Sequence, residues 1–179
     1  MSAASSRLLA FAPLLALLAA GVMFSFAVMR GAPARPSALI GHQAPPLTLQ
    51  KLDGVTVPEL TEQDLSGGTT VVNFWASWCA PCLVAMPHLI ALQKDYGPLG
   101  LQVVGISMDD SAVPAKAVAA RFAFNYPLLL GDARLGARFG GVLGLPEEIL
   151  VGRNGKILKI WSGEVTPAEL DRAIKTAIN

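Results

Sequence analysis

WASWCAPC, residues 75–82, contains both cysteines of this 179-residue chain, Cys79 and Cys82, separated by two residues. The residues around its start, 70–75 (TVVNFW), are mostly β-branched or aromatic, which is typical of a buried central strand. Beyond it, apolar residues recur at helical spacing before Gly97, at Leu83, Met86 and Ile90. The cysteine pair is therefore expected at a strand-to-helix junction, with the helix beginning at about Cys79.

Outside this junction, short apolar runs alternate with amphipathic ones. The predicted elements are a hairpin over 47–60, a helical turn over 61–67, a strand over 101–108, a helix over 111–122, a strand over 126–130, a link, a hairpin of 147–152 with 156–161, and a helix after Thr166. Arg153-Asn154-Gly155 is a strong hairpin signal, and Thr166-Pro167-Ala168-Glu169 combines a helix cap with a proline at the first helical position. The order predicts an α/β fold with an open mixed sheet covered on both faces by helices.

The N-terminal part has a different composition. Leu8–Met29 runs for 22 residues without a charge, and a helix of that length is roughly 33 Å long, enough to cross a hydrocarbon core of about 30 Å. Secretory signals usually have shorter apolar cores of about 7–15 residues, although a cleaved signal remains the alternative. We therefore expect a membrane anchor or signal segment over 1–30, a linker over 31–37 and a folded domain over 38–179. The basic residues on the two sides nearly balance, so charge alone does not orient the segment.

Composition excludes several classes of protein. The formal net charge is +1, without a basic cluster or an acidic run, so nothing favours binding to nucleic acid. Two cysteines are too few for a disulfide-built scaffold, and a domain of about 140 residues can bury its own core.

The position of Cys79 points to thiol chemistry. At the first turn of a helix, unpaired N–H groups and the positive end of the helix dipole stabilise a thiolate, which is the reactive form of cysteine. Cys82 lies one turn later, within reach of Cys79. Such a pair can attack a disulfide in a partner, form a mixed disulfide and resolve it internally.

Three other interpretations of the pair are weaker. A structural disulfide closing so short a loop would remove little chain entropy. A zinc site would need further ligands, and the only other cysteine or histidine candidates are His42 and His88. A peroxidatic cysteine of the P-x-x-x-T-x-x-C type would need proline and threonine where this chain has Val72 and Ala76.

Residues 74–82 (FWASWCAPC) resemble the active site of thioredoxin. Pro87 matches the proline that kinks the active-site helix of that family, and Leu145-Pro146 stands where the family places a cis-proline beside the dithiol. Within the superfamily, the chain is most similar to the membrane-anchored TlpA/ResA/DsbE (CcmG) group, because 37–41 (SALIG) followed by Pro45 resembles the opening of DsbE-type domains.

This resemblance implies a thioredoxin-like fold with an N-terminal β-hairpin extension and an N-terminal transmembrane helix. It implies a thiol–disulfide oxidoreductase, commonly a reductase, tethered to the bacterial inner membrane and facing the periplasm. The expected partners are an oxidised protein such as apocytochrome c and a transmembrane thiol donor of the DsbD or CcdA type. The redox group is expected to be the Cys79–Cys82 disulfide itself, with no cofactor and no metal.

The resemblance also assigns roles to residues. Cys79 attacks, Cys82 resolves, and the expected supporting residues are Trp78, Ala80, Pro81, Leu145, Pro146 and Glu147. A proline before the second cysteine restrains the active-site turn, which favours a reduction potential nearer thioredoxin's roughly −270 mV than DsbA's roughly −120 mV.

The sequence departs from the group at two acidic positions. Thioredoxin has a buried aspartate where this chain has Asn73, and the TlpA-like group usually has a glutamate where this chain has Ala85. A carboxylate near the dithiol can carry a proton to and from Cys82. Glu147 and Glu148 are the nearest replacements, and DsbE-type proteins often have Pro-Glu-Thr there, so Glu147 is the preferred candidate. Because side chains alternate along a strand, only one of the two is expected to face inward.

Other functions stay open at this point. One is general maintenance of periplasmic thiols, with an antioxidant role or electron delivery to copper-site assembly proteins. Another, from a different class, is a thioredoxin-fold metallochaperone that carries copper on the two thiolates, although no Met-rich or His-rich tract accompanies the pair.

Overall fold

The computed structural model describes residues 17, 19–23, 38–47, 50–52, 65 and 67–179. The chain divides into two compact units, Met1–Pro36 and Ser37–Asn179. Most of the predicted membrane segment and hairpin, the linker and nearly all of the predicted helical turn over 61–67 lie outside the described residues. Within the described part, no helix is both long and apolar enough to cross a membrane.

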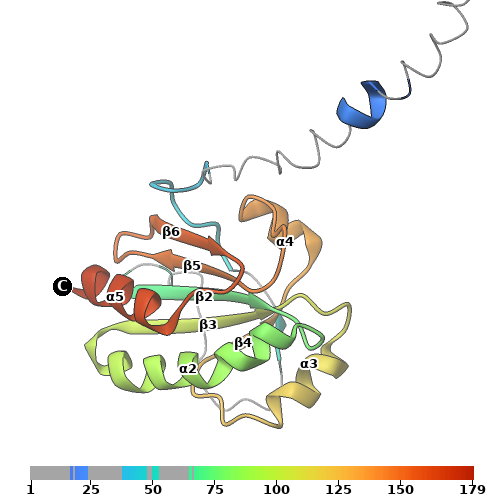
Figure 1. Ribbon diagram of the computed structural model, residues 1–179. Helices are drawn as coiled ribbons and strands as arrows, with labels where there is room; N and C mark the ends of the chain where they lie inside the picture. Colours follow the sequence, from blue (N-terminus) through green and yellow to red (C-terminus); the bar gives the residue numbers. More distant parts are fainter. Residues whose placement is uncertain (1–16, 18, 24–37, 48–49, 53–64, 66) are drawn as a thin grey trace, which may run out of the picture. The chain divides into compact units, whose positions relative to one another are not determined.

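The second unit is built on one mixed sheet, whose described strands follow the order β1-β4-β3-β2-β5-β6 (Figure 1). The strands are β1 (Gln50–Lys51), β2 (Thr69–Trp75), β3 (Leu101–Ser107), β4 (Leu128–Leu130), β5 (Glu147–Val151) and β6 (Ile157–Ser162). β2 pairs in parallel with β3 and antiparallel with β5, which places it at the centre, as predicted. β1 pairs antiparallel with β4 at the edge of the sheet.

Helices cover both faces of this sheet. They are α2 (Ala80–Tyr96), α3 (Ala112–Ala119), α4 (Ala133–Arg138) and α5 (Pro167–Ile178), with a 3-10 turn η1 (Gly97–Leu99) after α2. Side chains alternate along β2, so Val71 and Trp75 join the core layer under α2, α3 and α5. Val72 and Phe74 join the opposite layer, to which α4 contributes. The predicted mixed sheet with helices on both faces is confirmed.

Local signals account for most element boundaries. The hairpin between β5 and β6 turns at Gly155, which has a φ of +74° that favours glycine. Thr166 caps α5 by accepting a hydrogen bond from the backbone N–H of Glu169. The one described helix that the sequence analysis did not predict is α4, which lies in the stretch expected to be a link. It begins where the Asp132 side chain accepts a hydrogen bond from Leu135 N.

Gly105 in the middle of β3 makes room for the core beside the active-site strand. A Cβ there would lie 2.5 Å from Leu128 Cδ2 and 3.3 Å from Trp75 Nε1. We expect Gly105→Ala to lower the free energy of unfolding by about 1–3 kcal/mol, because the packed neighbours must shift. Urea unfolding measures this. Gly144→Ala is the matched control, since a Cβ there would meet no atom within 4 Å, and an equal loss in both variants would contradict the packing argument.

Candidate active site

Cys79 and Cys82 lie where β2 passes into α2. Cys79 is the N-cap of α2, with extended backbone angles, and its Sγ accepts a hydrogen bond from Cys82 N at 3.2 Å. The two residues form a disulfide with Cα atoms 5.3 Å apart, and both are buried. The described first turn of α2 contains Pro81 and no acidic residue. No negative charge within that turn therefore disfavours a thiolate on Cys79 after reduction.

The supporting residues predicted from the sequence differ in how far they are exposed to solvent. Trp78 is 73% exposed beside Cys79, and Ala80 is exposed as well. The Leu145-Pro146 peptide bond is cis, Pro146 is buried, and Leu145 packs against both core layers.

A pocket of about 380 Å³ brings α2 and the start of β5 together. Its lining consists of Pro81, Val84, Ala85, His88, Pro146, Glu148, Glu164, Val165, Thr166 and Pro167. Pro81 precedes Cys82 in α2 and Ala85 follows it by about one turn, so the pocket lies along the same part of the helix, although Cys82 itself does not line it. Two of the predicted supporting residues, Pro81 and Pro146, therefore meet at one hollow although they are far apart in sequence.

Of the two glutamates, the structure places Glu148 at this pocket rather than Glu147, the preferred candidate. Glu148 lines the pocket, whereas Glu147 points to the other face of β5, where its Oε2 accepts a hydrogen bond from Ser162 Oγ at 3.0 Å. Alternation along the strand separates the two side chains, as expected. Both are nevertheless buried, because β5 is an inner strand between β2 and β6 with a core layer on each face.

Glu148 lies directly across from Asn73 in the pairing of β5 with β2. Asn73 Nδ2 donates to Glu148 Oε1 at 3.2 Å, and Glu148 Oε2 has no hydrogen-bond partner in the described part of the chain. Asn73 occupies the position where thioredoxin has its buried aspartate. A buried acid is thus present on the neighbouring strand, within the Glu147-Glu148 pair that the sequence predicted, and the strand register selects Glu148.

Burial dominates the electrostatics of this acid. It raises the pKa of Glu148 to about 7, while the hydrogen bond from Asn73 lowers the pKa and the nearby Glu147 raises it further. Burial also raises the pKa of Glu147, and the hydrogen bond from Ser162 opposes that shift. On the other side of the pocket, burial lowers the pKa of His88, against the influence of Asp171. Glu148 can therefore gain or lose a proton near neutral pH.

Comparison with known proteins decides the family. A model of the AhpC/TSA family matches residues 40–160. The chain belongs to the AhpC/TSA family. It is 37% identical to the thiol:disulfide interchange protein HelX of Rhodobacter capsulatus, over 83% of each chain. It is 27% identical to the thiol-disulfide oxidoreductase ResA of Bacillus thuringiensis subsp. konkukian, over 76% of this chain and 77% of that one.

Solved structures agree with this family. A structure from Chlorobium tepidum, described as a thiol:disulfide interchange protein DsbE, superposes with a TM-score of 0.71 and 28% identity, over 78% of this chain and 98% of that one. A second Chlorobium tepidum structure, a thiol:disulfide interchange protein of the thioredoxin family, gives a TM-score of 0.68 and 27% identity, over 83% and 100%. The predicted thioredoxin-like fold and likeness to the ResA/DsbE group are confirmed. This AhpC/TSA protein is a thiol–disulfide oxidoreductase whose redox group is the Cys79–Cys82 disulfide.

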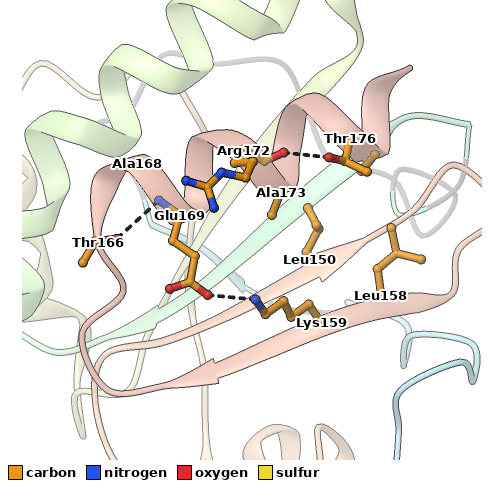
Figure 2. Close-up of a pocket in the computed structure, with 10 residues that line it drawn as sticks. Leu150, Leu158, Lys159, Thr166, Ala168, Glu169, Arg172, Ala173 and Thr176 are labelled. Carbon is orange, nitrogen blue, oxygen red and sulfur yellow. Dashed lines mark hydrogen bonds and ion pairs between the residues drawn. The ribbon is translucent and has the colours of Figure 1, made fainter.

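A second pocket, of about 610 Å³, lies between β6 and α5. Figure 2 shows Leu150 and Leu158 on one side of it. At one end, Lys159 Nζ forms an ion pair with Glu169 Oε1 at 2.8 Å. No predicted active-site residue lines this pocket. Among the described residues, no cluster of three or more His, Cys, Asp or Glu side chains is arranged to hold a metal.

Proposed function

We propose that this protein reduces disulfides in exported proteins, with apocytochrome c as a substrate. The observation that carries the proposal is the dithiol at the N-terminus of α2, beside a pocket lined by Pro81 and Pro146. Its relatives named for thiol:disulfide interchange support the reaction type. The uncharged run Leu8–Met29 supports a membrane anchor that holds the domain on the periplasmic face of the inner membrane.

The reaction needs only the two cysteines and a proton carrier. The Cys79 thiolate attacks one sulfur of the substrate disulfide, and the other substrate sulfur leaves as a thiolate that takes up a proton. Cys82 then attacks Cys79 Sγ, which releases the second substrate sulfur and forms the Cys79–Cys82 disulfide. Two electrons have passed to the substrate. A dithiol donor of the DsbD or CcdA type would restore the reduced pair by the same exchange.

Glu148 is the carboxylate that we assign to the resolving step. Cys82 must lose its proton to attack, and a base with a pKa near the working pH does this best. Glu148 lines the pocket beside Cys82 and has one carboxylate oxygen without a hydrogen-bond partner in the described structure. The substrate thiolate released in the same step can accept the proton in turn.

The reduction potential tests the proposal. We expect the purified protein, equilibrated in graded thiol–disulfide buffers, to have a midpoint near or below about −250 mV, since a dedicated reductant must be harder to reduce than its substrates. Alkylation followed by mass spectrometry counts the free thiols. A midpoint above about −150 mV would indicate an oxidant or isomerase and would contradict the proposal. Stoichiometric copper on protein purified without oxygen would favour the metallochaperone alternative instead.

A further inference from the structure

A buried carboxylate holds the loop that leads into the dithiol. Asp109, two residues after β3, is 6% exposed. Its Oδ1 and Oδ2 accept from Ser77 N at 3.2 and 3.0 Å, and Oδ1 accepts from Ser77 Oγ at 2.7 Å. Oδ2 also accepts from Ser107 Oγ at 2.8 Å. Ser77 lies two residues before Cys79, so the carboxylate is fixed close to the N-terminus of α2 by donors that are all uncharged.

The same loop is also tied by backbone groups. Met108 N donates to Trp75 O at 2.7 Å, and Cys79 N donates to Ala76 O at 3.1 Å. These bonds do not involve the Asp109 side chain. The loop therefore keeps much of its support when the carboxylate is replaced, and the charge can be tested apart from the loop conformation.

We infer that Asp109 is a positioning residue whose fixed negative charge keeps the Cys79–Cys82 dithiol a strong reductant. A negative charge near Cys79 disfavours a second negative charge on its sulfur. Reducing the disulfide takes two electrons and leaves a thiolate on Cys79 and, with one proton taken up, a thiol on Cys82. Whatever stabilises the thiolate stabilises the reduced form and makes the protein more oxidising. The negative charge of Asp109 destabilises the thiolate, and therefore the reduced form, and so makes the protein more reducing.

The alternative is that the role of Asp109 is purely structural. Replacing Asp109 would then change the pKa of Cys79 in the opposite direction. If the carboxylate only held the loop, losing it would let Cys79 move away from the helix N-terminus. The thiolate would then lose the support of the helix dipole, and the pKa of Cys79 would rise. The other titratable groups that line the pocket beside the dithiol are His88, Glu148 and Glu164, and neither test below alters them.

The decisive test compares Asp109→Asn with Asp110→Asn, a change at the next residue, which is exposed. We expect Asp109→Asn to lower the pKa of Cys79, followed by thiolate ultraviolet absorbance, by about half a pH unit. The equilibrium with glutathione above that pKa should move about threefold towards the reduced protein, which corresponds to about 14 mV. Asp110→Asn should change neither value. An unchanged or higher Cys79 pKa in folded Asp109→Asn would overturn the inference.

A second variant decides the matter if Asp109→Asn does not fold. Asp109→Ala removes the same charge without placing an amide N–H group against the donors of Ser77 and Ser107. The pKa of Cys79 should again fall, and an unchanged or higher value in the folded variant would overturn the inference. The inference rests on the thiol–disulfide activity alone. Both readouts omit any protein substrate, so they stay informative if the proposed substrate class is wrong.

Discussion

Cys82→Ser is expected to stop the reaction at a stable mixed disulfide between Cys79 and the substrate. Cys79 caps α2, where its thiolate is stabilised, and the serine hydroxyl cannot displace the substrate sulfur. Turnover of a disulfide-containing peptide should fall by at least about 10³-fold, while the first attack continues. Mass spectrometry under non-reducing conditions should find one peptide bound to each protein molecule.

Cys79→Ser is the matched control, because it removes the attacking thiol and keeps the other. It should be equally inactive and should trap no peptide. A stable adduct on Cys82 in the Cys79→Ser variant, with none in Cys82→Ser, would show that the two cysteines have exchanged roles. That outcome would contradict the assignment made from the helix cap.

Glu148→Gln is expected to slow the resolving step and to stabilise the folded protein at the same time. The slow step should lose about 10²-fold in rate, since glutamine cannot accept the proton of Cys82. In the unchanged protein, the resolving rate should rise through about pH 7 as Glu148 ionises, and this inflection should be absent from the variant. Rapid mixing of the reduced protein with a peptide disulfide over a range of pH values measures both.

The stability effect follows from the direction of the pKa shift. The unfolded chain releases this proton near the ordinary value of 4.5, whereas the folded protein keeps it until about pH 7. The folded protein therefore loses stability as pH rises between these values, and the loss is complete above them. The loss in the free energy of unfolding amounts to about 3 kcal/mol at most. Glu148→Gln should recover this free energy at pH 8 and not at pH 4.

Glu147→Gln is the control for the kinetic effect only, because burial raises the pKa of Glu147 as well and its replacement is also expected to change stability at high pH. It changes the adjacent carboxylate, which lies on the opposite face of β5 and bonds to Ser162. The pH profile of resolution should keep its inflection near pH 7. Loss of the inflection in Glu147→Gln, together with its retention in Glu148→Gln, would return the role to the residue that the sequence favoured.

Features that depend on a few adjacent residues could be predicted from the sequence. The beginning of α2 at Cys79, the turn at Gly155 and the cap at Thr166 each follow from local backbone preferences and capping bonds. α4 was missed because it has only six residues, too few for a periodic pattern to stand out. Its capping residue, Asp132, was the available signal.

The role of Asp109 could not be predicted for a different reason. The residue follows an apolar strand and belongs to no motif, and its partner Ser77 is 32 positions away in the chain. Only the parallel pairing of β2 with β3 brings the ends of those strands together. Their side chains can then form one hydrogen-bonded cluster at the entrance to α2.

The sequence by itself determined the reactive pair, its place at a helix N-terminus and an α/β fold with a mixed sheet. These depend on contiguous residues and on hydrophobic spacing. The tertiary structure alone decided which of the two glutamates lines the pocket beside α2. The register of β5 against β2 sets Glu148 opposite Asn73, on the face covered by α2, and turns Glu147 to the other face. Because strand side chains alternate, a shift of one residue in that register would exchange the two acids.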